Sequence, residues 1–338
     1  MLSRRLMSAA GAELPQAIAV AHFTTPFITA YAFDAASGFG TKVSNPGTLP
    51  GSTAYRVKFS RDRLYVGVAY NADAGMGIYP WSSSGFGTRL SDPATTPASG
   101  RAVAFGDSHV FFGGASSPYI YAYPFTGGAI GTKIADPGTL PTGVANDIAV
   151  TSASDAVAIA HDTSPRVTAY PWSGSGFGSK FSNPGTLPTG QGGGVAFRSA
   201  DDAIVVAHDS SPYVSGYPWS GSGFGSKYSN PGTLPAGWAR DVEFSPDGNY
   251  VVVVHDTTPF VRAYTWSSGF ASTFSNPGTL PAGGGKGAAF SRESDAVAVA
   301  HATTPYVTAY PFSGSGFGTK YSNPASLPAG GGQGVAFL

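Results

Sequence analysis

The sequence predicts an all-β protein, a seven-bladed β-propeller with four antiparallel strands per blade. A Gly-Phe element recurs through the chain every 44 to 47 residues, once in a degenerate form. Each repeat contains four short apolar segments separated by Gly, Pro, Ser and Asn. Four strands in a repeat of roughly 40–50 residues are typical of a propeller blade. The element is centred on Phe39, Phe86, Ile130 (the degenerate copy), Phe177, Phe224, Phe270 and Phe317.

The four segments of a repeat alternate as strands do. The first is represented by 193–197 (GGVAF), the second by 295–301 (DAVAVAH), the third by 305–312 and the fourth by 224–230. In the second segment, valines and a terminal His share one face, while alanines occupy the other. Period-two alternation with β-branched and aromatic residues predicts strands, 28 in all for seven repeats.

The two ends of the repeat array predict a closed ring. Residues 1–15 are expected to form an N-terminal arm, either flexible or docking, and residues 16–338 the propeller. The array begins at a second strand, 16–22, and ends at a first strand, 333–338. The C-terminal strand is therefore expected to complete the N-terminal blade and to remove an open sheet edge.

Composition excludes several classes of function. The chain has 338 residues, 19 basic and 19 acidic residues, and no Cys. Balanced charge predicts no nucleic-acid partner. The absence of Cys excludes disulfides and thiolate metal sites. No apolar run approaches the ~20 residues of a spanning helix, so no membrane insertion is predicted, and the N-terminal residues lack a convincing signal peptide. No cofactor is predicted.

One stretch resembles known propeller families. Residues 244–266, FSPDGNYVVVVHDTTPFVRAYTW, resemble the strand–turn–strand core of WD-repeat and YVTN-type propellers, although the Trp-Asp and Gly-His dipeptides of WD repeats are missing. The repeat consensus is similar to repeats in uncharacterised proteins encoded by tailed bacteriophages, over residues 16–338. This resemblance implies a virion or tail-associated protein made in the host cytoplasm.

Histidines at one repeat position are the first candidate binding residues. Three of the five are followed by Asp. The position lies one strand out from the axis. The imidazole rings of adjacent blades are therefore too far apart to share one metal ion, and no metal site is predicted. A structural role at the blade interface is favoured, with repeated ligand pockets on the loop face as the alternative. The candidates are His22, His161, Asp162, His208, Asp209, His255, Asp256 and His301.

Departures from the repeat consensus supply a second candidate set. Asp73 and Met76 lie in a blade that lacks the His and the Ser/Thr-Pro step, and Trp238 and Arg240 interrupt a Gly-rich loop. A partner that binds once would favour such a sector, and simple sequence drift explains it equally well.

Three functions compete at this stage. The first is a non-enzymatic virion propeller that mediates attachment or docking, either to other virion proteins through the arm or loop face, or to a host glycan or receptor. The second is a purely structural spacer of an assembly. The third, a propeller hydrolase or lyase, is disfavoured because most titratable residues are copied around the ring, so no catalytic residue is predicted.

Overall fold

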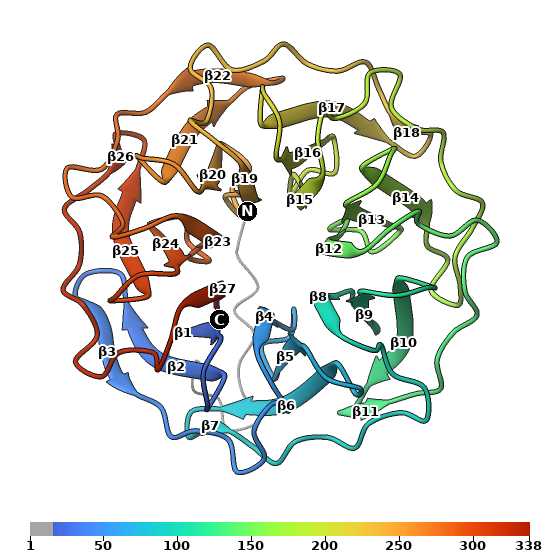
Figure 1. Cartoon of the computed structure of the whole chain (residues 1–338), viewed down its shortest axis with the longest axis horizontal. Coiled ribbons are helices and arrows are strands. Elements are labelled where there is room, and N and C mark those ends of the chain that lie inside the picture. Colours follow the sequence, from blue (N-terminus) through green and yellow to red (C-terminus); the bar gives the residue numbers. More distant parts are fainter. Residues whose placement is uncertain (1–15) are drawn as a thin grey trace, which may run out of the picture.

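The structure, a computed structural model, describes residues 16–338 and shows seven sheets arranged radially around a central axis (Figure 1). The described part contains strands and no helices, and hence no helix able to cross a membrane. The predicted all-β, seven-bladed propeller is confirmed. The predicted arm, 1–15, lies outside the described residues.

Each blade is an antiparallel sheet that runs outward from the axis. The innermost strands, blades one to seven, are β27 (Gly332–Phe337), β4 (Ala54–Phe59), β8 (Gly100–Phe105), β12 (Ala145–Val150), β15 (Gly192–Phe197), β19 (Ala239–Phe244) and β23 (Gly285–Phe290). The second strands are β1 (Ala17–His22), β5 (Tyr65–Tyr70), β9 (His109–Gly114), β13 (Ala156–His161), β16 (Ala203–His208), β20 (Tyr250–His255) and β24 (Ala296–His301).

The two outer positions of each blade follow in the same order. The third strands are β2 (Ile28–Asp34), β6 (Met76–Ser82), β10 (Ile120–Thr126), β14 (Val167–Pro171), β17 (Val214–Ser220), β21 (Val261–Trp266) and β25 (Val307–Ser313). The outermost strands are β3 (Gly38–Lys42), β7 (Gly85–Phe86), β11 (Ala129–Ile130), β18 (Gly223–Phe224), β22 (Phe270–Thr273) and β26 (Gly316–Phe317).

Blade four differs from the prediction of 28 strands. Its sheet has three strands, and the fourth position is reduced to an isolated bridge between Trp172 and Phe177. Four of the other blades have an outermost strand of only two residues. An outermost strand has a partner on one side only, so few pairs hold it before the chain turns toward the next blade.

Ring closure occurs as predicted. The C-terminal strand β27 pairs antiparallel with β1, with Ile18 opposite Phe337 and Val20 opposite Val335. The blade therefore joins the two ends of the repeat array, and β1 is paired on both sides, with β27 and with β2.

In six of the seven blades, a buried tyrosine bonds the blade to the connection that precedes it. The Tyr31 hydroxyl on β2 donates to the Ser326 carbonyl at 2.7 Å, and the Tyr264 hydroxyl on β21 donates to the Thr233 carbonyl at 2.9 Å. The same bond recurs at Tyr123, Tyr170, Tyr217 and Tyr310. All six side chains are fully buried, so these hydroxyls hold the long connections against the sheets.

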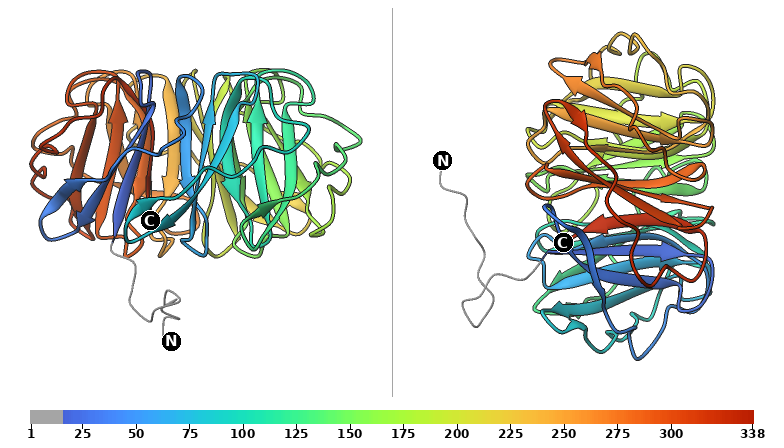
Figure 2. Two further views of the ribbon diagram at one scale, coloured as in Figure 1. Left: turned by 90° about the horizontal axis from the view of Figure 1, so that it is seen from below. Right: turned by 90° about the vertical axis from the view of Figure 1, so that its left-hand side faces the viewer.

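The connections form two faces of a disk, and the strands run between them (Figure 2). We call loop face the side that carries the loops after the second strands, such as 23–27, and the long connections between blades. We call turn face the side that carries the hairpin turns between first and second strands, such as 60–64. The axis opens onto both faces.

Candidate active site at the propeller axis

The innermost strands place unrepeated charges at the axis. The repeat position held by Gly in β15, β23 and β27 carries Arg56 in β4, Asp147 in β12 and Asp241 in β19. Two residues further on, where the other blades have Ala, stand Lys58 and Glu243. The first level carries a charge in three of the seven blades and the second level in two, so the axis lacks the sevenfold regularity of the outer strands.

Arg56 forms the floor of the loop-face opening. Its guanidinium donates to the carbonyls of Lys286 and Gln333 at 3.2 Å and of Gly193 at 3.3 Å. Its Nε lies 3.5 Å from Asp147 Oδ1, and Nη2 lies 3.8 Å from Asp241 Oδ1. One side chain from blade two thus reaches across the axis and contacts blades one, four, five, six and seven.

Above Arg56 lies a cavity of about 650 Å³ that opens on the loop face. This volume is within the range of small-molecule sites. Its walls combine basic, amide and aromatic side chains with a single carboxylate. The walls include Phe23, Tyr55, Arg101, Asn146, Asp162, Gln191, Trp238, Arg240, Lys286 and Gln333. We call this cavity the axial pocket.

Two arginines of the axial pocket are stacked on aromatic rings. Arg101 Cζ lies 4.2 Å from the centroid of the Tyr55 ring, and Arg240 Cζ lies 3.2 Å from that of Trp238. A stacked guanidinium is fixed in orientation, and its N–H edges stay available for carboxylate or phosphate oxygens.

Several polar atoms of the pocket residues are buried without a hydrogen-bond partner in the described part of the chain. They are Arg101 Nε, Arg240 Nε, Trp238 Nε1 and Asp162 Oδ1. Buried polar groups are normally paired, and a bound ligand is one of the few ways to satisfy several of them together.

The walls of the axial pocket are electropositive. The lining contains the cations Arg101, Arg240 and Lys286 and one carboxylate, Asp162, and Arg240 pairs with Asp256 at 3.5 Å. Burial lowers the pKa of Lys286, and the neighbouring Arg240 adds to this effect. An anion in the pocket would relieve this repulsion, so the pocket favours negatively charged ligands.

On the turn-face side of Arg56, Lys58 donates to Glu243 across the axis. Burial raises the pKa of Glu243 to about 7; Lys58 opposes this effect and Asp241 adds to it. The three axial carboxylates outnumber the two axial cations, so the cluster favours retaining a proton.

The Glu243→Gln variant tests whether Glu243 retains a proton in the folded state. The folded-state pKa of Glu243 lies above its ordinary value of 4.5, so its contribution to stability is complete below about pH 4.5 and is lost as the pH rises through 7. We expect the melting temperature of the variant, relative to wild type, to rise by a few degrees between about pH 5 and 8. The control is Glu293→Gln, at an exposed turn position. Parallel curves of melting temperature against pH for wild type and Glu243→Gln would contradict the expectation.

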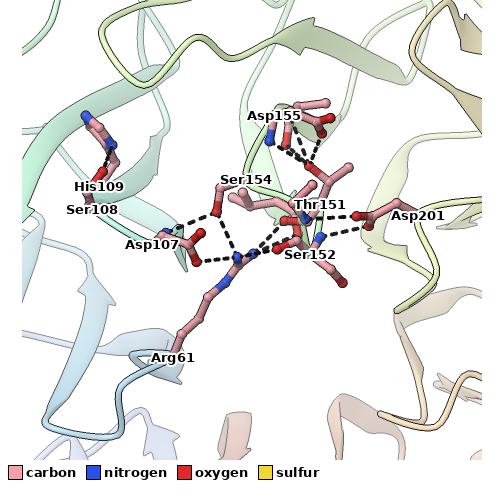
Figure 3. Close-up of polar contacts among 12 residues, drawn as sticks. Arg61, Asp107, Ser108, His109, Thr151, Ser152, Ser154, Asp155 and Asp201 are labelled. Carbon is pink, nitrogen blue, oxygen red and sulfur yellow. Dashed lines mark hydrogen bonds and ion pairs between the residues drawn. The ribbon is translucent and has the colours of Figure 1, made fainter. Parts of the chain in front are cut away.

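Arg61 fastens three blades together on the turn face (Figure 3). Its guanidinium donates to Asp107 Oδ1 at 2.8 Å in blade three and to Ser154 Oγ and the Thr151 carbonyl, at 2.7 and 2.6 Å, in blade four. Asp201 of blade five accepts from the Ser152 amide at 2.7 Å, which extends the chain of contacts by one blade.

Removing this side chain is expected to destabilise the ring. Arg61→Leu should lower the free energy of unfolding by about 1–2 kcal/mol, because charge-assisted bonds to two other blades are lost while water can still reach the freed acceptors. Chemical denaturation measures the change. Arg292→Leu is the matched control, since Arg292 is exposed at the same turn position in blade seven. Equal effects of the two variants would exclude the inter-blade role.

The predicted histidines all end second strands, and their side chains are fully buried. His22 Nε2 lies 2.9 Å from Thr29 Oγ1 on the neighbouring third strand. The same pairing joins His161 to Thr168, His208 to Ser215 and His301 to Thr308. In blade six Arg262 replaces the hydroxyl residue, and both ring nitrogens of His255 are without a partner among the described residues. A ligand-binding role for these rings stays a prediction, and contact would require the loops above them to open.

The remaining predicted residues are divided between the axial pocket and other places. Asp162, Trp238 and Arg240 line the pocket, although the sequence analysis assigned them to two different sets. Asp256 pairs with Arg240, and Asp209 Oδ1 accepts a hydrogen bond from the backbone N–H of Gln191 at 2.9 Å. Asp73 is exposed, whereas Met76 is fully buried. The binding roles proposed for both sets stay predictions.

Most residues of the axis were not among the candidates predicted from the sequence, namely Arg56, Lys58, Arg101, Asp147, Asp241, Glu243 and Lys286. The available signal was the appearance of charges in first strands, which elsewhere carry Gly and Ala. Among the described residues, no group of three or more His, Asp and Glu side chains could hold a metal ion.

Comparison with known proteins finds relatives by structure alone. No family model and no curated protein sequence matches the chain. A protein from Bacteroides fragilis, provisionally named a 6-phosphogluconolactonase, superposes with a TM-score of 0.77 at 13% identity, over 98% of this chain and 99% of its own. A similarly named protein from Bacteroides uniformis gives 0.74 at 12% identity, over 96% and 100%. The periplasmic gluconolactonase of Pseudomonas aeruginosa gives 0.70 at 15% identity, over 96% and 99%.

These comparisons correct the predicted function. At such identities the likeness establishes the fold, and these three neighbours are named as lactonases, with no link to phage or virion proteins. The prediction of a non-enzymatic, virion-associated attachment protein is therefore contradicted. The physical reason lies at the axis. Most titratable residues are copied around the ring, which disfavoured an enzyme, but the first strands gather a charge set that occurs once.

Proposed function

We propose that the chain is a hydrolase that opens lactones of anionic sugar acids in the axial pocket. The observation that carries the proposal is the unrepeated set of basic side chains around one lining carboxylate, with unpaired N–H groups of Arg101, Arg240 and Trp238. The names of the solved neighbours direct the choice of reaction toward ester hydrolysis of a sugar lactone.

The pocket contains the groups that lactone hydrolysis requires. Asp162 acts as general base: it takes a proton from water while the water oxygen bonds to the lactone carbonyl carbon. Arg101, on the adjacent blade, stabilises the negative charge that develops on the carbonyl oxygen. The bond between that carbon and the ring oxygen then breaks, the ring oxygen receives the proton from Asp162, and the open hydroxy acid leaves.

The test is a direct assay of ring opening. Purified protein is mixed with 6-phosphogluconolactone or gluconolactone, and acid release is followed with a pH indicator after subtraction of spontaneous hydrolysis. We expect acceleration of both reactions, with the larger kcat/KM for the phosphorylated lactone because the walls are basic. If folded protein accelerates neither reaction, the proposal is wrong.

A further inference from the structure

We infer that the axial pocket has two poles, and that the substrate is a sugar-acid lactone with a phosphate or carboxylate at the end remote from its carbonyl. Blades six and seven form an anchoring pole for that anion, and blades three and four form the pole where the ring opens. The assignment of the second pole rests on the proposed function. The anchoring pole stands on its own contacts.

The arrangement of the blades separates the poles. Strands β8 and β12 lie across the axis from β19 and β23 (Figure 1). Arg101 and Asp162 belong to blades three and four, and Arg240 and Lys286 to blades six and seven. A ligand in the pocket therefore has basic groups at both ends and Arg56 beneath it.

In the described part of the chain, the pocket wall at the anchoring pole carries two cations and no carboxylate. Arg240 is held flat on Trp238, and the Lys286 side chain comes from the neighbouring first strand. Asp256 pairs with Arg240 at 3.5 Å and also acts electrostatically on Lys286, and Asp209 acts electrostatically on Arg240. Neither carboxylate is among the residues that line the pocket. Arg240 Nε and Trp238 Nε1 are both buried and unpaired among the described residues, so the pole offers two N–H donors as well as charge.

Arg56 fixes the backbone of this pole. It donates to the carbonyl of Lys286 at 3.2 Å and to that of Arg240 at 3.4 Å. The two residues that supply the cations are thus held by the same guanidinium. A pole held in this way is preorganised, so less ordering is needed when an anion binds.

The opposite pole is balanced. Arg101, stacked on Tyr55, contributes one cation, and Asp162 contributes one carboxylate with an unpaired Oδ1. A full anion gains little from such a pair, whereas an uncharged carbonyl can be polarised by the cation while the carboxylate activates water. The charged end of the substrate therefore points toward blades six and seven.

Calorimetric binding of open-chain acids tests the anchoring pole without turnover. The probes are 6-phosphogluconate, glucarate and gluconate, which carry at the remote end a phosphate, a carboxylate and no anion. We expect 6-phosphogluconate or glucarate to bind wild type more tightly than gluconate. We call gain the affinity of the acid with a remote anion relative to that of gluconate. Lys286→Gln and Arg240→Gln should each reduce this gain about tenfold or more, because each removes a charge-assisted contact. Whichever of the two acids binds more tightly identifies the anion as phosphate or carboxylate.

Two further variants keep the test decisive. Lys286→Arg keeps the charge and should retain most of the gain, and Arg101→Gln should leave it unchanged because that residue lies at the other pole. The inference would be overturned if wild type bound neither 6-phosphogluconate nor glucarate more tightly than gluconate. It would also be overturned if Arg101→Gln lost this affinity difference, or if both anchor variants kept it. Anchor-dependent binding without lactone hydrolysis would contradict the proposed function alone, and hydrolysis without anchor-dependent binding would contradict the inference alone.

Discussion

Acidification from about pH 7 to pH 5 is expected to unfold the propeller in a steep transition. The cause is the ring of buried histidines at the ends of the second strands. Burial lowers the pKa of each from 6.5 to about 4. The unfolded chain therefore binds protons between about pH 6.5 and 4 that the folded chain does not bind, and stability falls as the pH falls through this window. The histidines are His22, His161, His208, His255 and His301.

The size of the effect follows from the number of buried histidines. With a shift of this size, each histidine costs about 2 kcal/mol at pH 5, because one pKa unit corresponds to about 1.4 kcal/mol. Together the five histidines lower the free energy of unfolding by about 10 kcal/mol, which is comparable to the whole stability of a typical domain, about 5–15 kcal/mol.

Equilibrium unfolding as a function of pH measures this coupling. We expect the free energy of unfolding near pH 5 to have a slope that corresponds to uptake of about five protons. His208→Gln should reduce that slope by about one proton, whatever its cost at neutral pH. The control is Arg61→Leu, which weakens the ring without removing a histidine and should leave the slope unchanged. A slope near zero in wild type, or an equal slope in wild type and His208→Gln, would show that these rings do not govern acid stability.

Replacing Asp162 with Asn is expected to lower kcat for lactone hydrolysis by about 10²–10⁴-fold, the range found for loss of a general base. KM should change little, because the anchoring pole across the axis is intact. The assay is the acid-release measurement described above, with each variant's fold checked by thermal denaturation.

Asp209→Asn is the matched control. Asp209 follows His208 in blade five as Asp162 follows His161 in blade four, but the Asp209 carboxylate is already bonded to the Gln191 amide, and Asp209 is not among the residues that line the axial pocket. We expect near-normal kcat in this variant. Equal losses in both variants, or normal kcat in Asp162→Asn, would mean that Asp162 is not the base.

The blade and the ring follow from the amino-acid pattern alone. Period-two alternation identified the strands, and the recurring Gly-Phe element counted the repeats, because neighbouring residues decide which side of a strand faces the next sheet. A second strand at one end and a first strand at the other predicted the pairing of β27 with β1. The same local pattern placed the histidines at the ends of second strands.

The residues on the axis come together only in the folded chain. Arg56, Asp147 and Asp241 stand in three different repeats, and in each repeat they look like isolated departures from Gly. They meet because ring closure brings the same position of every first strand to one point, where low solvent access makes each charge depend on the others. Averaging over repeats favours what the blades share, whereas the candidate chemistry depends on the residues in which they differ.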